Sequence, residues 1–395
     1  MPSTLQPLSQ TNRDVSLDIL RGFALAGVLL TFCITDARSA PGYSKTLLDQ
    51  IVDWPKWLFI ENRMYTMLII IFGMGFHVQL ERAKQKGASF TPVFLRRALG
   101  LIIIGFLHAI FLSTRDILMF YGIAGSVLLL LRNAKNWQLW TLMGLVFFVF
   151  APFIARIQTG FQAFSLPQPN NYGDHVKHNW EFFKLYHQIY FIYAEMLLHF
   201  MLGYIISKTG FFQKLKDTKK LRRKLLISSL IATALFIPLC YFYLPSLYPF
   251  LKNIKSQWVL FLAATGLRVA WQVCMIVCVT LYATILVGIY KSAKGKKWLL
   301  PLASFGQMSL SNYLIQSIVL VPYLLVFDKY DNMPPFNGFI LFICTLALQL
   351  LFSGWWMTRY TMGPFEWLLR SFTYWKWQPI KKSVLVVKNY QTIFS

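Results

Sequence analysis

The sequence predicts an all-α, polytopic transmembrane helical bundle of about ten spans, and three observations carry that prediction. First, 56% of the 395 residues are hydrophobic and only 14% are charged, whereas a soluble domain carries about 25% charged residues. Second, apolar stretches repeatedly reach the roughly 20 residues that cross a bilayer as a helix. Third, the 39 Lys and Arg residues gather in short segments between those stretches. A soluble enzyme and a secreted disulfide scaffold are therefore excluded.

The formal net charge of +24 would indicate a nucleic-acid partner if the protein were soluble. Here the basic residues flank apolar stretches, which is the pattern that sets membrane topology. We therefore expect the lipid bilayer as a partner and no nucleic acid. The five cysteines all fall inside apolar stretches, so no disulfide framework is expected. No metal and no resident cofactor are expected either.

The chain is expected to form a single integral-membrane domain over residues 1–395. The first apolar stretch is not a cleavable signal peptide, because it starts late, contains LDILRG and lacks a small-residue cleavage site. The ten predicted spans are 17–36, 62–80, 97–113, 115–131, 137–155, 190–207, 225–245, 257–290, 299–327 and 337–360.

One of these spans is too long for a bilayer. A helix over 257–290 would extend about 50 Å, whereas the hydrocarbon core is about 30 Å thick. Projection of the helix into the outer aqueous phase is the simpler interpretation, and a broken helix is the alternative. Residues 156–190, which are polar and aromatic by turns, are expected to form a partly ordered extracytoplasmic loop.

Basic residues orient the predicted bundle. With ten spans and a cytoplasmic N-terminus, the inward-facing segments together hold most of the Lys and Arg residues. They include 82–97, 132–135, 214–224, 291–297 and the C-terminal tail. Because positive charge favours the cytoplasmic side, both termini are predicted to be cytoplasmic. After the last span, 361–395 is expected to be a cytoplasmic amphipathic segment whose aromatic residues and lysines suit a membrane interface.

Five sequence blocks carry a family resemblance. They are LDILRGFALAGVLL (17–30), MYTMLIIIFGMGF (64–76), GFLHAIFLSTRDILMFYGIAG (105–125), FGQMSLSNYLIQS (305–317) and GPFEWLLRSFTY (363–374). In this order they resemble the YeiB-like family of bacterial inner-membrane proteins, a domain of unknown function. That family is distantly similar to membrane-embedded acyltransferases, whose first helix carries a similar D-x-L-R-G opening. The resemblance implies a multi-pass protein of the bacterial inner membrane and acyl transfer as a candidate activity.

One residue departs from the acyltransferase pattern. In those enzymes a His eleven residues after the Arg of the opening faces the active site. Here that position is Phe32. The fold analogy is therefore better supported than the transfer of that catalytic mechanism.

Ionisable residues inside a bilayer cost several kcal/mol unless paired or hydrated, so each is a candidate site residue. His108 and Asp116 flank an expected outward-facing turn, where the carboxylate could orient the imidazole as a general base. Both lie in the block 105–125. We predict His108 and Asp116 as the catalytic pair, with a structural hydrogen bond of the His as the alternative.

Further polar residues are predicted to bind substrate. Asp18 and Arg21 lie three residues apart, where they suit either an anion clamp for a phosphorylated or CoA-like donor or a structural pair. Asn312 and Gln316 lie four residues apart, either lining a hydrated cavity or joining helices. The full predicted substrate-binding set is Asp18, Arg21, Glu61, Arg63, Tyr65, Tyr121, Asn312 and Gln316.

Glu195 and His199 lie one turn apart in the sixth span, where they suit a proton relay or a buried hydrogen bond. Arg268 and Gln272, again one turn apart, are predicted to neutralise Glu195 from an adjacent helix.

The leading functional prediction is transfer of an acyl group, from a donor such as acyl-CoA, to a sugar, lipid or small-molecule acceptor at or across the membrane. The first alternative is a proton-coupled transporter of a small polar or amphipathic solute, in which His108, Asp116 and Glu195 relay protons. The second alternative is a noncatalytic partner protein of the envelope. The sequence predicts no particular oligomeric state.

Overall fold

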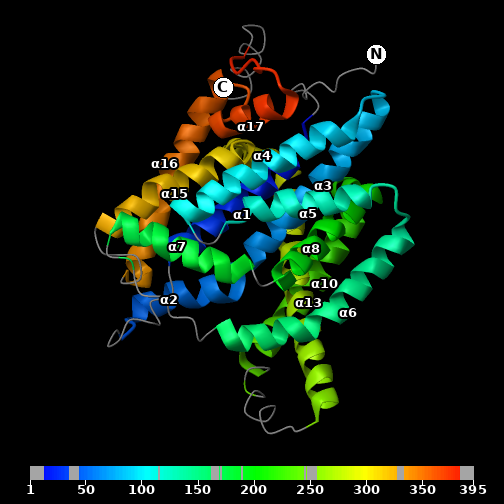
Figure 1. Ribbon diagram of the computed structural model, residues 1–395, viewed down its shortest axis with the longest axis vertical. Coiled ribbons are helices and arrows are strands. Elements are labelled where there is room, and N and C mark those ends of the chain that lie inside the picture. Colours follow the sequence, from blue (N-terminus) through cyan, green and yellow to red (C-terminus); the bar gives the residue numbers. More distant parts are fainter. Residues whose placement is uncertain are drawn as a thin grey trace.

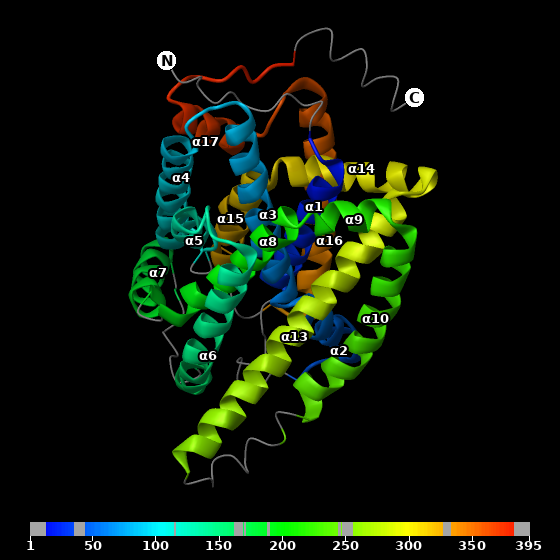
Figure 2. The ribbon, with the colours of Figure 1, turned by 90° about the vertical axis from the view of Figure 1, so that its right-hand side faces the viewer.

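The computed structural model describes residues 13–34, 44–113, 116–161, 169, 171–187, 190–243, 246, 256–326 and 333–382. Within them the secondary structure is helical apart from an isolated bridge between Tyr360 and Lys381, so the predicted all-α class is confirmed. Figures 1 and 2 show the helices packed side by side as a bundle. They are α1 (Val15–Cys33), α2 (Leu47–Pro55), α3 (Arg63–Gln85), α4 (Phe90–Phe111), α5 (Leu118–Leu130), α6 (Asn136–Phe161), α7 (Tyr172–His187), α8 (Tyr190–Lys208), α9 (Phe211–Asp217), α10 (Lys219–Pro238), α13 (Gln257–Tyr290), α14 (Ala293–Gln307), α15 (Ser309–Val326), α16 (Pro335–Arg359) and α17 (Pro364–Tyr374), with the π-helical turns η3 (Lys56–Ile60) and η4 (Leu239–Tyr243).

Seven helical stretches among the described residues are long and apolar enough to cross a membrane. They are Val15–Cys33, Leu47–Gln85, Phe90–Phe111, Lys219–Tyr243, Thr265–Tyr290, Ser309–Val326 and Pro335–Arg359. Several of these helices expose large apolar side chains at helical spacing, as Leu95, Leu99 and Ile103 do on α4. An exposed apolar stripe of this kind needs a nonpolar solvent. The chain is therefore a helical membrane protein.

The predicted span 299–327 is not one helix. α14 ends at Gln307 and α15 begins at Ser309, and Figure 2 shows α14 lying crosswise at the end of the bundle that carries α17. The Glu366 carboxylate of α17 accepts hydrogen bonds from the backbone amides of Leu310 (2.7 Å) and Ser311 (3.2 Å). The first amides of a helix have no partner within the helix, so Glu366 caps α15 and stabilises the break.

The position of Glu366 gives its cap a pH dependence. Burial raises the pKa of Glu366 above its ordinary value, although hydrogen bonds from Ser311 and Leu310 act in the opposite direction. An unfolded-chain Glu titrates near pH ~4.3, so the folded state holds this proton to a higher pH than the unfolded state does. Protonation of Glu366 therefore stabilises the folded state. This stabilisation is complete below about pH 4.3 and is lost as the pH rises through the pKa of Glu366 in the folded state.

Glu366→Gln removes this titration. The free energy of unfolding of the wild type minus that of the variant is therefore expected to decrease between about pH 4 and pH 8. Denaturant titrations of both proteins in mixed micelles measure this difference in unfolding free energy. The other titrating groups are the same in both proteins, so their contributions cancel. A difference that stays constant or increases with pH would contradict the burial of this carboxyl group.

The long predicted span 257–290 is a single helix. α13 runs without interruption through 34 residues, which removes the alternative of a broken helix. Figure 2 shows its first turns extending past the neighbouring helices at the end opposite α17. Trp258 and Leu262 are exposed there. Projection of this end beyond the bilayer core stays a prediction.

The segment 156–190 contains more helix than a loop prediction implies. α6 continues to Phe161, and α7 occupies Tyr172–His187. Asn171 starts α7, because its side-chain oxygen accepts a hydrogen bond from the Asp174 amide (2.9 Å). His175 and Asn179 then bind α7 to the carbonyl groups at the end of α4, at 3.0 Å and 3.1 Å.

Two glycines bring α1 and α14 into close contact at the end of the bundle where α1 begins. A Cβ at Gly22 would collide with the backbone oxygen of Leu302, and a Cβ at Gly306 would collide with that of Asp18. Only glycine allows this approach. Both residues belong to the blocks that carry the family resemblance, and their contact fixes Asp18 and Arg21 beside α14.

Candidate functional site

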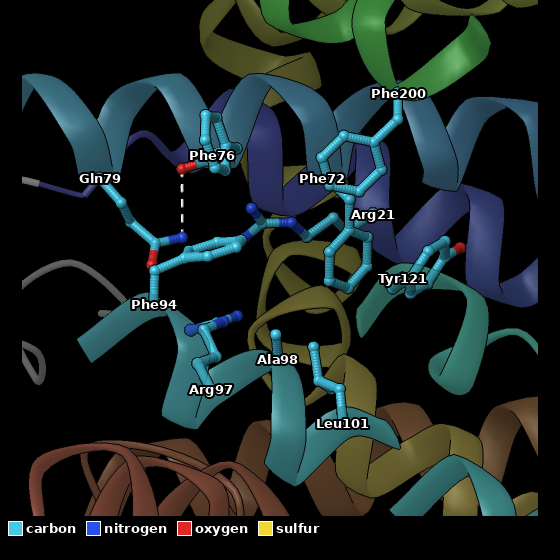
Figure 3. A pocket seen from close by; sticks show the side chains of 11 residues that line it. Arg21, Phe72, Phe76, Gln79, Phe94, Arg97, Ala98, Leu101, Tyr121 and Phe200 are labelled. Carbon is cyan, nitrogen blue, oxygen red and sulfur yellow. Dashed lines mark hydrogen bonds between the residues drawn. The ribbon is translucent and has the colours of Figure 1, made fainter. Parts of the chain in front are cut away.

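A cavity that is partly open to solvent lies between α1, α3, α4, α5 and α8. Figure 3 shows Arg21 and Arg97 reaching into the same space, surrounded by aromatic rings. The lining residues are Arg21, Phe72, Gly75, Phe76, Gln79, Phe94, Arg97, Ala98, Leu101, Tyr121 and Phe200.

Arg21 enters this cavity from α1 while pairing with Asp18. Asp18 is buried and lies 3.2 Å from the Arg21 guanidinium, so the predicted pair is present. The same carboxylate receives two hydrogen bonds from Arg13, at 2.6 Å and 3.0 Å. Because Asp18 is shared between two guanidinium groups, it does not neutralise both. Positive charge is left on the cavity wall.

Arg97 adds to this charge from α4. It forms no ion pair within the described part of the chain, and the nearby charges of Arg370 and Arg21 both repel it. Glu366 attracts it more weakly. A partly buried guanidinium group without a carboxylate is costly unless an anion binds it. The cavity is therefore suited to a phosphate or carboxylate beside an apolar group.

His108 and Asp116 meet, as the sequence predicted, although neither side chain lines the cavity. The Nδ1 atom of His108 lies 3.0 Å from Oδ1 of Asp116, and both side chains are buried. The other Asp116 oxygen accepts a hydrogen bond from the Met119 amide (2.8 Å), which fixes the carboxylate at the start of α5. The Nε2 atom of His108 lies 2.9 Å from the Ser317 hydroxyl of α15.

Tyr121 links the cavity to this pair. Its ring stacks on Phe72 at a centroid distance of 4.1 Å and lines the cavity. Figure 3 shows its hydroxyl group directed away from the two arginines. The hydroxyl is buried, has no hydrogen-bond partner among the described residues, and is close enough to Asp116 to interact electrostatically with it. His108 follows Leu101 by seven residues, about 10 Å farther along the same face of α4.

Two other predicted binding residues join helices instead of lining the cavity. Asn312 donates to Ser353 (2.9 Å) and Gln316 donates to Gln349 (2.9 Å), both on α16. Gln349 also donates to the Asn312 carbonyl group (3.1 Å). These contacts agree with the alternative in which Asn312 and Gln316 hold neighbouring helices together.

Glu61, Arg63 and Tyr65 separate into two environments. Arg63 is fully buried, donates to the carbonyl groups of Trp57 and Glu61, and binds the Tyr241 hydroxyl at 2.8 Å. Arg63 therefore stabilises the turn before α3, away from the cavity. Tyr65 is the member that lies near the site, since it interacts electrostatically with Tyr121.

The predicted contact between the sixth and eighth spans is present. Arg268 of α13 forms an ion pair with Glu195 of α8, and Gln272 donates to the other Glu195 oxygen. Gln272 also interacts with the buried His199 side chain. The Glu195 carboxylate is thus bound by two residues of α13. This agrees with a structural role for Glu195, the alternative to a proton relay.

Sequence reasoning missed two residues of the site. Arg97 was counted only among the basic residues that set topology, although it lies seven residues inside α4. Ser317 ends the block 305–317, and no local pattern connects it to His108, 209 positions away. The only indication in the sequence was that Arg97 and Ser317 are polar residues within apolar stretches.

Comparisons with known proteins find relatives whose function is unknown. Residues 206–376 match the family described as protein of unknown function (DUF418). Uncharacterized protein YxaH of Bacillus subtilis (strain 168) is 28% identical, over 97% of this chain and 100% of its own length. An uncharacterized 39.9 kDa protein in the amylase 3′ region of Bacillus acidopullulyticus is 26% identical, over 94% and 96% of the two chains. Uncharacterized protein YeiB of Escherichia coli (strain K12) is 24% identical, over 91% and 96%. These matches support the predicted YeiB-like family of unknown function, and they do not show a similarity to acyltransferases.

Proposed function

We propose that this chain, which belongs to the YeiB-like family of unknown function, is a bacterial inner-membrane acyltransferase. It takes an anionic acyl donor, such as acyl-CoA, and passes the acyl group to a sugar, lipid or small-molecule acceptor. The observation that carries the proposal is the cavity lined by Arg21, Arg97 and Tyr121, together with the buried His108–Asp116 pair with which Tyr121 interacts electrostatically.

The proposed topology has ten spans with both termini in the cytoplasm. Under this topology the α3–α4 turn, with Arg82, Lys84 and Lys86, faces the cytoplasm. Gln79 and Arg97 lie near that turn, so the cavity opens toward the compartment that contains acyl-CoA. The apolar rings around the arginines suit an amphipathic donor better than a free inorganic anion.

The chemistry assigned to His108 is general base catalysis. The imidazole takes the proton of the hydroxyl group that attacks the acyl carbonyl carbon, and it returns a proton to the thiolate as the C–S bond breaks. The Asp116 carboxylate, whose Oδ1 lies 3.0 Å from Nδ1, is assigned to stabilise the protonated ring by its charge. This role does not require a first-helix His, which this chain replaces with Phe32.

Arg97→Gln tests the donor site. The variant is expected to bind desulfo-CoA about tenfold or more weakly than the wild type, because a charge-assisted bond to a phosphate contributes ~1.5–3 kcal/mol. Calorimetric titration of the full chain in zwitterionic nanodiscs measures this affinity. Arg96→Gln is the matched control, since Arg96 lies next to it but donates to its own helix at Pro92 and does not line the cavity. Equal affinity of Arg97→Gln and wild type would refute the assigned donor site.

Proton-coupled transport is the competing proposal. The observation that favours it is the ionisable group of Glu195, His199 and Arg268 between α8 and α13, because such residues in membrane proteins often form ion pathways. Transport requires two compartments, whereas acyl transfer persists in detergent. Solute accumulation in sealed vesicles without acyl transfer in micelles would favour the transporter.

A further inference from the structure

His108 of α4, Ser317 of α15 and Asp116, which precedes α5, lie together as a candidate base, nucleophile and acid. Ser317 Oγ lies 2.9 Å from His108 Nε2, and His108 Nδ1 lies 3.0 Å from Asp116 Oδ1. We propose that Ser317 is the catalytic nucleophile and carries the acyl group as a serine ester between two half-reactions. This inference rests on the proposed function and extends it to a covalent mechanism.

Each member of the triad is held by a different part of the fold. Asp116 is fixed by the Met119 amide at 2.8 Å, and the Tyr313 ring lies against the His108 imidazole at a centroid distance of 4.8 Å. All three triad side chains are at least 95% buried. A serine whose base is oriented by a third group is the arrangement that activates hydroxyl nucleophiles.

A second serine–histidine contact shows what an inactive arrangement looks like in the same chain. Ser207 Oγ lies 3.0 Å from His77 Nδ1, but the nearest carboxylate, that of Glu81, is 4.0 Å from the ring. Glu81 is exposed and pairs with Lys84 at 2.9 Å. The Ser207–His77 contact therefore lacks the buried orienting acid that Asp116 provides.

The surroundings of Ser317 also differ from those of the other polar residues on α15. Asn312 and Gln316 bind amide and hydroxyl groups of α16, which hold helices together without an ionisable partner. Ser317 instead faces a titratable ring across the bundle. Tyr121, whose buried hydroxyl has no partner among the described residues, is available to donate a hydrogen bond to a bound acyl carbonyl group.

The two half-reactions balance with a thioester donor and a hydroxyl acceptor. In the first, Ser317 Oγ bonds to the acyl carbon, its proton passes to His108 Nε2, and the C–S bond breaks as the thiolate takes that proton. In the second, the acceptor hydroxyl gives its proton to His108 and attacks the ester carbon. The bond to Ser317 then breaks, and its oxygen recovers the proton.

The test uses the full chain in nanodiscs with a fluorophosphonate probe, which labels activated serines, followed by peptide mass spectrometry. We expect label on Ser317 of the wild type and its loss in Ser317→Ala and His108→Gln. Ser207→Ala is the matched control and is expected to label as the wild type does. Label on other serines only, or none on the wild type, would overturn the assignment.

A second measurement tests the role of Ser317 as nucleophile separately from the proposed acyltransferase function. Wild-type protein incubated with octanoyl-CoA, without acceptor, is expected to carry an octanoyl ester on Ser317, and Ser317→Ala is expected to transfer about 10³-fold or more slowly. Transfer by Ser317→Ala at the wild-type rate would overturn the nucleophile but retain the transferase. Label on Ser317 without transfer to any sugar, lipid or alcohol acceptor would retain the nucleophile and reject the transferase.

Discussion

Replacing His108 with glutamine is expected to lower the rate of acyl transfer by a factor of about 10² to 10⁴, the usual contribution of a positioned general base. Glutamine can still hydrogen-bond Ser317 and Asp116, so loss of the base is separated from loss of packing. The measurement is transfer from a radiolabelled acyl-CoA by the full chain in micelles.

His77→Gln is the matched control for this experiment. His77 also contacts a serine hydroxyl, but Glu81 lies 4.0 Å from its ring and pairs with Lys84. Its variant is expected to retain the wild-type rate, with a thermal midpoint close to that of His108→Gln. Comparable activity of His108→Gln and His77→Gln would contradict the assignment of His108 as the base.

Breaking the Glu195–Arg268 ion pair is expected to lower the free energy of unfolding by about 3 kcal/mol. Glu195→Gln leaves the Arg268 guanidinium, which is 6% exposed, without its carboxylate. This expected loss lies at the lower end of the losses typical of broken buried ion pairs, because the Glu195 side chain is 29% exposed. Denaturant titration in mixed micelles measures the change.

Exchanging the two residues tests whether the pair itself is responsible. The double variant Glu195→Arg, Arg268→Glu is expected to recover part of the loss caused by either single substitution. Thr280→Ala on α13 serves as a control, since its hydroxyl bonds only to its own helix at Ile276, and a change under about 1 kcal/mol is expected. A double variant no more stable than the single variants would rule out the pairing.

The contacts that sequence reasoning predicted correctly are local or rest on charge. Asp18 and Arg21 are one helical turn apart, and His108 and Asp116 flank one short turn, so spacing alone brings each pair together. The Glu195–Arg268 contact is more distant in sequence. It was predictable because a buried carboxylate requires a cation and few cations lie inside the spans.

The features that were missed depend on distant residues. The apolar sequence continues across Met308, and the start of α15 is stabilised by Glu366, more than fifty positions away. For the same reason the partners of Asn312 and Gln316 on α16 could not be assigned from helical spacing. Composition located these polar residues within the spans, but only the packing of α15 against α16 decides what they bind.

The most direct test of the proposed function is a density map of the full chain in a nanodisc with a non-hydrolysable acyl-CoA analogue. The account predicts phosphate density between Arg21 and Arg97, with the acyl carbonyl group directed past Tyr121 toward His108 and Ser317. Two results would contradict the account. One is phosphate density away from both arginines, and the other is a lipid chain in the cavity with no density for the added analogue.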